Sequence, residues 1–394
     1  MSTVVTNPEK TIEEKGARPL FQYLIVIQPL GFLYGSAGNF LSPENLVGRS
    51  GSSFPPSAAA LSGVFAAHYN STETNDDDKK KKLKPLQVAG PFWGFNEELD
   101  NFLVPTPFNC LVEMKRDGED EENQVRAGQV QQKIFWHTKD QKWLDQNYQV
   151  PKGKFFRGSW IKINDWHKVN SEQWQDTEVF EAPWHYVPYL HPQLEKQQRR
   201  VDAALERGSL FLENAVALHP DTCIVYLAND KLPYGWYRFG GEGHMVNLEW
   251  RSLSFQCQEL LENGSLSKSF ALVTPAIWGS NRLSEREPIV AQTNQKAWQV
   301  EAMLTERPSP YRYRLGKRSL EQPLEEVSNR QPHKPGRLSR GRYAVPAGTV
   351  YVLKKPFELE NTWQKWPDSW FPKEAYSFKR WGCGLALPLD NAIA

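Results

Sequence analysis

The chain has 394 residues, with 47 Lys or Arg against 46 Asp or Glu, and its formal net charge is +1. This length allows two domains of ordinary size, each with its own hydrophobic core. The charge balance excludes a global field that would draw the protein to nucleic acid or to a membrane surface, so any site for a polyanion must be local.

Cysteine usage and the first residues bear on the cellular compartment. The four cysteines are scattered, without a C-x-x-C pair, which argues against a zinc site or a disulfide framework and fits a reducing environment. Residues 1–15 are polar and charged, and no run reaches the roughly 18 apolar residues of a membrane span. We therefore predict a cytoplasmic protein without a membrane partner.

The first part of the chain is expected to form a strand, a long loop and a helix. Residues 21–27 are an aromatic and β-branched run between two prolines, which is typical of a buried strand. Glycines recur through residues 28–54 and indicate a loop. Apolar residues return at helical spacing over residues 58–69, after two prolines that suit a first helical turn. Together these segments are half of a β-α-β unit.

Residues 70–84 read N-S-T-E-T-N-D-D-D-K-K-K-K-L-K and contain almost nothing to bury. Low hydrophobicity and segregated charge predict a disordered insertion. A lysine run can also bind RNA without sequence preference, but a solvated insertion is the simpler interpretation.

Strands are expected to dominate the second half. A charged, helix-compatible segment at 193–207 is followed by two strand patterns at 208–218 and 223–227, joined by a turn at 219–222. Further strand patterns occupy residues 270–274 and 343–353, the second of them interrupted by P-A-G at 346–348.

The motif Y-R-F-G-G-E-G-H at 237–244 lies between two strand patterns. Glycines permit positive φ and a close approach of the backbone to a ligand, and successive free N–H groups in such a turn can bind an anion. Arg238 and His244 flank the glycines with donors suited to phosphate. A simple hairpin turn explains the same glycines. A dinucleotide-binding motif does not fit, because the position of its third glycine is occupied by Val246.

A second local candidate is the basic segment at 307–342. It carries ten Lys or Arg against three Glu and is rich in proline, so it is expected to run over the surface as a loop. Basic loops are commonly only solvated, but tyrosines interleave with the charges here, which makes the segment a nucleic-acid candidate.

Four blocks in this order resemble one family. They are the strand and P-P-S helix at 23–29 and 53–63, R-F-G-G-E-G-H at 238–244, L-V-T-P-A at 272–276 and R-Y-A-V-P-A-G-T-V-Y at 342–351. Together they resemble the third subunit, of the RAMP superfamily, in the Cmr or type III-B CRISPR RNA-guided effector complex. The loop at 31–40 departs from the family pattern, because it lacks the charged motif that members often carry after the first strand.

The resemblance implies an α+β fold of two ferredoxin-like, RRM-like domains with long insertions and glycine-rich loops. The N-terminal domain would span 18–190, with the disordered insertion near 70–84. The C-terminal domain would span 191–390, with the basic loop near 307–342.

The resemblance also implies a non-catalytic subunit for antiviral defence, with no cofactor and no metal. Such a subunit holds the 5′ repeat-derived tag of the CRISPR RNA and docks on the large polymerase-like subunit, alongside the backbone subunits of the complex. It meets target RNA only indirectly, because the guide reads the target by base pairing. The candidate RNA-binding residues are Arg238, Gly240, Gly241, Glu242, Gly243, His244, Arg337, Arg340 and Arg342.

Two other functions remain open. Some RAMP proteins are metal-independent RNA endonucleases, and His244 is the histidine in a phosphate-binding motif that could act as general acid or base. The 15 tryptophans could instead form a carbohydrate-binding platform, although most tryptophans in folded proteins lie in the core.

Overall fold

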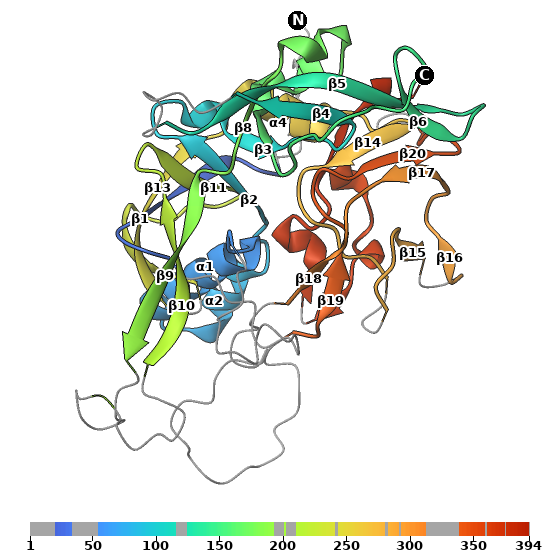
Figure 1. Cartoon of the computed structure of the whole chain (residues 1–394). Coiled ribbons are helices and arrows are strands. Elements are labelled where there is room, and N and C mark those ends of the chain that lie inside the picture. Colours follow the sequence, from blue (N-terminus) through green and yellow to red (C-terminus); the bar gives the residue numbers. More distant parts are fainter. Residues whose placement is uncertain are drawn as a thin grey trace, which may run out of the picture.

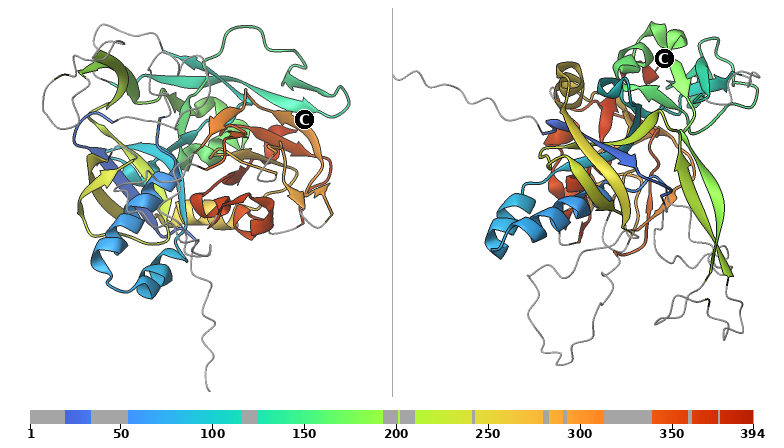
Figure 2. Two further views of the ribbon diagram at one scale, coloured as in Figure 1. Left: turned by 90° about the horizontal axis from the view of Figure 1, so that it is seen from below. Right: turned by 90° about the vertical axis from the view of Figure 1, so that its left-hand side faces the viewer.

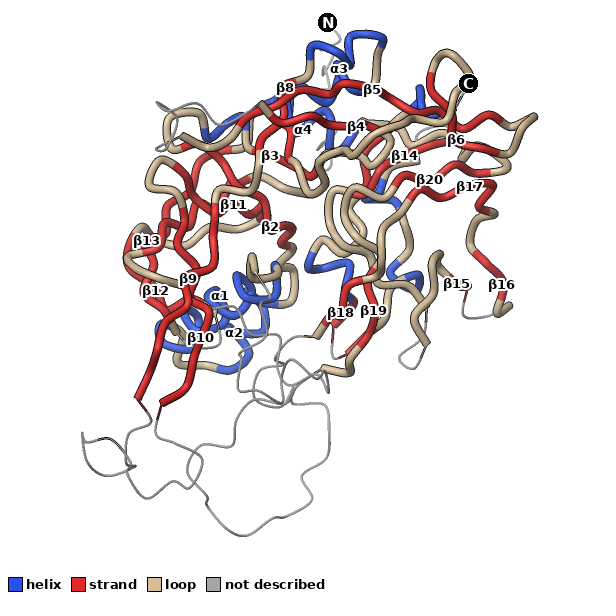
Figure 3. Tube along the Cα trace, viewed as in Figure 1, coloured by secondary structure: helices blue, strands red, loops and turns tan. Residues whose placement is uncertain are grey.

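The computed structural model is shown in Figure 1. It describes residues 20–33, 54–115, 124–192, 201, 210–240, 243–279, 283–290, 293–312, 339–358, 361–374 and 376–393. Strands predominate over helices, as Figure 3 shows, so the fold belongs to the mixed α and β class. None of the helices in the described ranges is long and apolar enough to cross a membrane.

The largest sheet begins with the strand order β12-β13-β1-β11-β2, and all of these neighbours are antiparallel. Leu24 and Val26 of β1 point to one face and Ile25 with Ile27 to the other, and all four are buried. This two-sided burial explains the continuous apolar run and confirms the predicted first strand. The bounds are β1 Tyr23–Pro29, β2 Val88–Phe95, β11 Thr222–Ala228, β12 Gly235–Phe239 and β13 His244–Ser252.

The same sheet continues from β2 through shorter strands in the order β3-β7-β8-β5-β4, with β6 paired to β5. A separate ribbon of β9 and β10 pairs over nine residues and projects from the body in Figure 1. The bounds are β3 Leu103–Pro105, β4 Cys110–Met114, β5 Ala127–His137, β6 Lys142–Asp145, β7 Trp160–Lys162, β8 Glu178–Phe180, β9 Trp184–Pro192 and β10 Leu210–Leu218.

The second sheet has the order β17-β20-β14-β23, again with antiparallel neighbours. The strand patterns expected on either side of P-A-G at 346–348 are confirmed as β19, which pairs with β18, and β20, which enters this sheet. The bounds are β14 Ser269–Leu272, β15 Ile289–Val290, β16 Gln295–Lys296, β17 Val300–Leu304, β18 Ser309–Tyr311, β19 Arg342–Ala344, β20 Val350–Leu353, β21 Lys373–Glu374, β22 Tyr376–Ser377 and β23 Ala386–Pro388.

One hydrophobic core joins the two sheets. Val26 of β1 and Val225 of β11 belong to the same buried cluster as Phe270 of β14 and Tyr351 of β20. Helix α4, Phe255–Asn263, contributes Leu261 to this cluster and connects the sheets in sequence. The predicted boundary between residues 190 and 191 cuts the first sheet, because β1 and β2 on one side of it pair with β11 on the other.

Helix α1, Ala58–Thr72, covers the opposite face of the first sheet, as Figure 2 shows. Leu61 and Phe65 are fully buried there beside Ile25 and Ile27. The helix predicted at 58–69 is thus confirmed and extends by three residues. A further short helix, α3, spans Trp166–Val169. It contacts the 3-10 turn Glu172–Asp176, which in turn contacts β5.

The disordered insertion predicted near 70–84 is wrong, because this segment completes α1 and forms helix α2, Asp76–Leu83. Asn75 caps α2, since its side-chain oxygen accepts the backbone N–H of Asp77 at 3.0 Å. Three Asp occupy the first turn and three Lys the last, which matches the helix dipole. These groups also form i,i+3 ion pairs. Charge order therefore stabilises a segment that has no apolar face.

Asn75→Ala should loosen α2 without unfolding the protein. The substitution removes the cap, which is worth about 1 kcal/mol, and α2 has no buried residue through which the loss could spread. We expect faster amide hydrogen exchange within residues 76–83 and an unchanged midpoint of global unfolding. A lowered global midpoint would show that α2 supports the core.

Candidate nucleic-acid interface

The glycine motif forms the turn of a hairpin between β12 and β13. Phe239 pairs with His244, so residues 240–243 form the connection. Gly240 and Gly243 have φ values of +73° and +69°, and the N–H of Gly243 donates to the carbonyl of Gly240 at 3.3 Å. The hairpin turn that was one interpretation of these glycines is present, but its first strand is β12 and not the strand pattern at 223–227, which forms β11. Gly241 and Glu242 lie outside the described residues.

The two described glycines of the turn differ in their surroundings. A Cβ built on Gly240 would meet nothing within 4 Å, so this glycine is required by its left-handed φ and not by a close neighbour. At Gly243 the nearest atom to such a Cβ is Cδ of Arg238, 3.7 Å away. The Arg238 side chain therefore lies beside the turn, where its guanidinium could contact a phosphate.

Alternation along β12 fixes which side chains face outward. Phe239 is 1% exposed and packs edge-on to Tyr226, which anchors the hairpin to the core beneath α1. Arg238 is exposed, and Trp236, two residues earlier on the same face, is 73% exposed. Strand β12 is also the last strand at this end of the sheet order.

Trp236 is a candidate that the sequence patterns did not single out. Tryptophans are expected mostly in the core, and the structure agrees for Trp93, Trp166 and Trp278, which are fully buried. The signal that could have identified Trp236 is its place two residues before Arg238 in an alternating strand. An exposed ring beside a cation is the arrangement that stacks a base next to a phosphate contact.

His244 lies at the base of the turn, half-buried, directly across from Phe239. Its place at the start of β13 puts it beside the loop that follows β1, because the N–H of Leu30 donates to the carbonyl of the next residue, Met245, at 3.2 Å. In the structure, His244 is therefore the half-buried first residue of β13, directly after the glycine turn.

The basic candidates lie elsewhere. Arg342 begins β19 and Arg340 lies two residues before it. Figure 3 shows β19 well apart from β12 and β13, on the other side of α1. Arg342 has a side chain that is 3% exposed, an ion pair with Glu374 at 2.5 Å and a guanidinium 5.0 Å from the Phe378 ring centroid. It is thus placed to hold β19 against the C-terminal residues. Arg340 is exposed, and Arg337 falls outside the described residues.

The described residues contain no group of three or more His, Cys, Asp or Glu side chains arranged to hold a metal ion. All four cysteines are buried and unpaired by disulfides. Burial raises the pKa of the Cys223 thiol to about 12 and that of Cys383 to about 12, so neither is a ready thiolate.

A family model described as CRISPR-associated protein (Cas_Cmr3) matches residues 28–390. The chain belongs to the Cas_Cmr3 family. This membership confirms the resemblance carried by the four sequence blocks and makes the Cas_Cmr3 chain a component of a type III CRISPR effector. Among curated proteins, none matches this chain.

Solved structures similar to this Cas_Cmr3 chain come from two types of effector complex. One is a chain of the type III-B Cmr-beta complex bound to cognate target RNA and AMPPnP, with TM-score 0.44 and 11% identity over 84% of this chain and 86% of that one. Another is a chain of the Csm3-Csm4 subcomplex of type III-A, with TM-score 0.34 and 11% identity over 86% and 99%. A third is a chain of the Csm1-Csm4 cassette with pppApA, with TM-score 0.30 and 10% identity over 86% and 88%. Because these TM-scores are all below 0.5, the assignment of the chain to its family rests on the family model.

Proposed function

We propose that this chain is the non-catalytic RNA-binding subunit of a type III-B complex and that it holds the 5′ repeat-derived tag of the CRISPR RNA. The observation that carries the proposal is the position of the exposed side chains of Arg238 and Trp236, which lie on one face of β12 beside the left-handed glycines Gly240 and Gly243. Backbone N–H groups and Arg238 would bind phosphate, and the Trp236 ring would stack on a base. Gly241, Glu242 and His244 complete this motif.

The proposed partners are the large polymerase-like subunit and the backbone subunits of the complex, with target RNA reached only through the guide. This part of the proposal follows from membership of the Cas_Cmr3 family.

We also propose that the fold contains two ferredoxin-like units. In a β-α-β-β-α-β unit the strands lie in the order fourth, first, third, second. The order β13-β1-β11-β2 has this arrangement, and so does β23-β14-β20-β17. Helix α1 provides the first crossover, whereas β12 stands where the second helix of the first unit would be. On this assignment the units meet near α4, after residue 252, and the β3–β10 region is an insertion in the first unit.

Arg238→Ala tests the RNA-binding proposal. For binding of the full chain to a labelled single-stranded RNA carrying the repeat-derived tag, we expect the slope of log affinity against log salt to become shallower by about 0.7 for each phosphate that Arg238 neutralises. Arg157→Ala is the matched control, because Arg157 is exposed on a remote loop and its ion pair with Glu306 is a surface pair. Equal effects of the two substitutions, or a flat salt response of the unaltered chain, would refute the proposal.

The competing proposal is a metal-independent endonuclease that uses His244. It requires that the isolated chain cleaves CRISPR RNA and that His244→Ala abolishes the cleavage. The binding proposal expects no cleavage from the isolated chain. Gel analysis of labelled RNA after prolonged incubation separates the two.

A further inference from the structure

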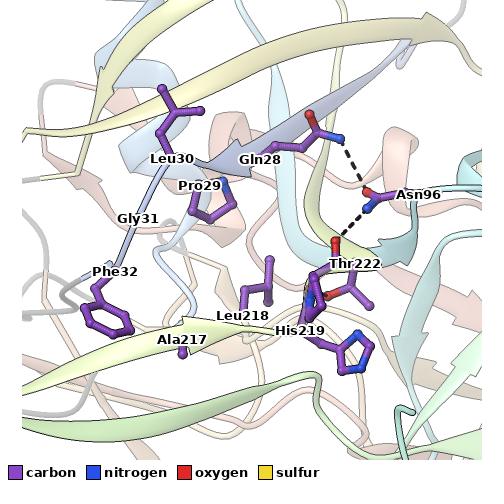
Figure 4. A pocket seen from close by; sticks show the side chains of 11 residues that line it. Gln28, Pro29, Leu30, Gly31, Phe32, Asn96, Ala217, Leu218, His219 and Thr222 are labelled. Carbon is purple, nitrogen blue, oxygen red and sulfur yellow. Dashed lines mark hydrogen bonds between the residues drawn. The ribbon is translucent and has the colours of Figure 1, made fainter. Parts of the chain in front are cut away.

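A pocket of about 500 Å³ opens where β1 ends (Figure 4). Its lining residue Leu30 donates its N–H to the carbonyl of Met245, which follows the glycine motif in β13. This volume lies within the range of small-ligand sites. The pocket is formed where β1 and β2 end and β11 begins, with β10 on its other side. It is lined by Gln28, Pro29, Leu30, Gly31, Phe32, Asn96, Ala217, Leu218, His219, Pro220 and Thr222.

The lining contains no Lys, Arg, Asp or Glu. A phosphate group would therefore find no charged partner among these residues, and a cation would find no carboxylate. Polar groups are nevertheless present among apolar ones, because two side-chain amides, a hydroxyl and an imidazole share the wall with Leu30, Phe32 and Leu218. A neutral, flat ligand with hydrogen-bonding edges fits this combination.

The two amides belong to one chain of hydrogen bonds. Nδ2 of Asn247 donates to Oε1 of Gln28 at 3.3 Å, and Nε2 of Gln28 donates to Oδ1 of Asn96 at 3.4 Å. Nδ2 of Asn96 then donates to the carbonyl of Pro220 at 3.0 Å. Each amide nitrogen has a second N–H and each amide oxygen a second lone pair. The wall can therefore offer a ligand one donor beside one acceptor, which is the pattern that Asn and Gln use to read the edge of a base.

The position of Gln28 follows from the alternation of β1. It lies on the same face as Leu24 and Val26, but two residues beyond the point where that face is buried in the shared core. On the neighbouring strands, Asn247 is the register partner of Gln28, and Trp236 is the register partner of Asn247. On one face of the sheet, the exposed ring of Trp236 in β12, the half-buried amide of Asn247 in β13 and the pocket residue Gln28 in β1 therefore lie side by side on adjacent strands.

Side chains of opposite charge lie near the two ends of this row of residues. Arg238 lies at the hairpin, whereas Glu249 lies beside the amides, where its Oε1 accepts from Nδ2 of Asn247 at 2.9 Å. A carboxylate there disfavours a phosphate and leaves a neutral base unaffected. The phosphate contact is thereby placed at the hairpin and the base contact at the amides.

We propose that this pocket receives one unstacked nucleobase of a single-stranded RNA whose backbone is held at the hairpin. Gln28 and Asn96 read the hydrogen-bonding edge of the base, and Leu30, Phe32 and Leu218 provide the apolar walls. The inference rests on the proposed RNA-binding function and adds to it a site that recognises a base, located where β1 ends.

The test uses the full chain and two series of fluorescently labelled RNA octamers, oligoadenylate and oligouridylate, in which each position in turn is made abasic. For the unaltered chain, we expect an abasic residue at one position of at least one series to weaken binding roughly tenfold. With Gln28→Leu or Asn96→Ala, the intact octamer should bind as weakly as that abasic octamer, and the abasic substitution should have no further effect. The salt slope should stay unchanged, because neither amide neutralises a phosphate.

Gln129→Leu is the matched control, since Gln129 is an exposed amide on β5, far along the same sheet. It should bind every octamer like the unaltered chain. Retained affinity in both pocket variants, or an abasic effect that persists in them, would overturn the pocket while leaving hairpin binding intact. Failure of the unaltered chain to bind any octamer in a salt-dependent way would instead overturn the proposed function, and the pocket with it.

Discussion

Gly382→Ala is expected to lower the free energy of unfolding by about 3 kcal/mol. Gly382 has φ +64°, which alanine tolerates poorly, and it ends the 3-10 turn at Phe378–Trp381. A Cβ there would lie 2.6 Å from the Cα of Ala89 and 3.2 Å from the carbonyl oxygen of Val88, both in β2. Because these neighbours are mostly backbone, the clash can be relieved only by moving the C-terminal residues away from the first sheet. Urea unfolding followed by tryptophan fluorescence measures the loss.

Gly63→Ala is the matched control for this effect. Gly63 is exposed in the interior of α1, and a Cβ there would meet nothing within 4 Å. Alanine is a better helix former than glycine by up to about 1 kcal/mol, so this substitution should stabilise the protein. If Gly382→Ala is as harmless as Gly63→Ala, the contact between the C-terminal turn and β2 does not hold the two halves together.

Above about pH 8, the free energy of unfolding of the unaltered protein should rise with pH relative to that of the Lys133→Met variant. Lys133 is 1% exposed, and its Nζ donates to the carbonyl of Val169 and to Oδ1 of Asn391, each at 2.5 Å. Both partners are neutral, and burial lowers the pKa of Lys133 to about 8. In the unfolded chain the pKa of Lys133 is about 10.4. Between about pH 8 and 10.4 the unfolded chain therefore binds more protons than the folded chain, and the free energy of unfolding increases with pH. The gain is on the order of 3 kcal/mol at most.

Urea unfolding of both proteins between pH 7 and 10.5 provides the comparison. Cys110 faces Lys133, and burial raises the pKa of its thiol to about 11, so this group lowers stability above its ordinary pKa in both proteins. The difference between the two curves removes that contribution except for the interaction between the two groups, since the charge of Lys133 lowers the pKa of Cys110 only in the unaltered protein. A difference that does not change with pH would show that Lys133 keeps its ordinary pKa in the folded protein.

The local elements were predictable where burial alone selects the residues. The strand patterns around Ile25 and Val225 are short continuous apolar runs, the helix around Phe65 is apolar at helical spacing, and each element formed as expected. Segment 70–84 was not predictable by that criterion, because α2 is stabilised by its Asn75 cap and by the order of its charges, which a count of apolar residues ignores.

The candidate site was predicted in part. The glycine spacing identified the turn, since residues that adopt positive φ at both ends of a hairpin connection are nearly always glycine, and Arg238 lies next to it as expected. Local basic charge was a weaker guide: it pointed equally to Arg342, which the structure buries against Glu374 and Phe378. A sequence shows that a residue is charged but not whether the folded chain supplies its counterion.

By itself the sequence determined several of the strands, the first helix, the glycine turn and the family, because each of these depends on a local pattern of residues. Only the tertiary structure decided which strands share a sheet, and it joined β1 and β2 to β11 across the expected domain boundary. It also decided that Trp236 is exposed and that Gln28, Asn96 and His219 surround one pocket. These residues are separated by up to 191 positions in the chain, and only strand pairing, which no local pattern specifies, brings them together.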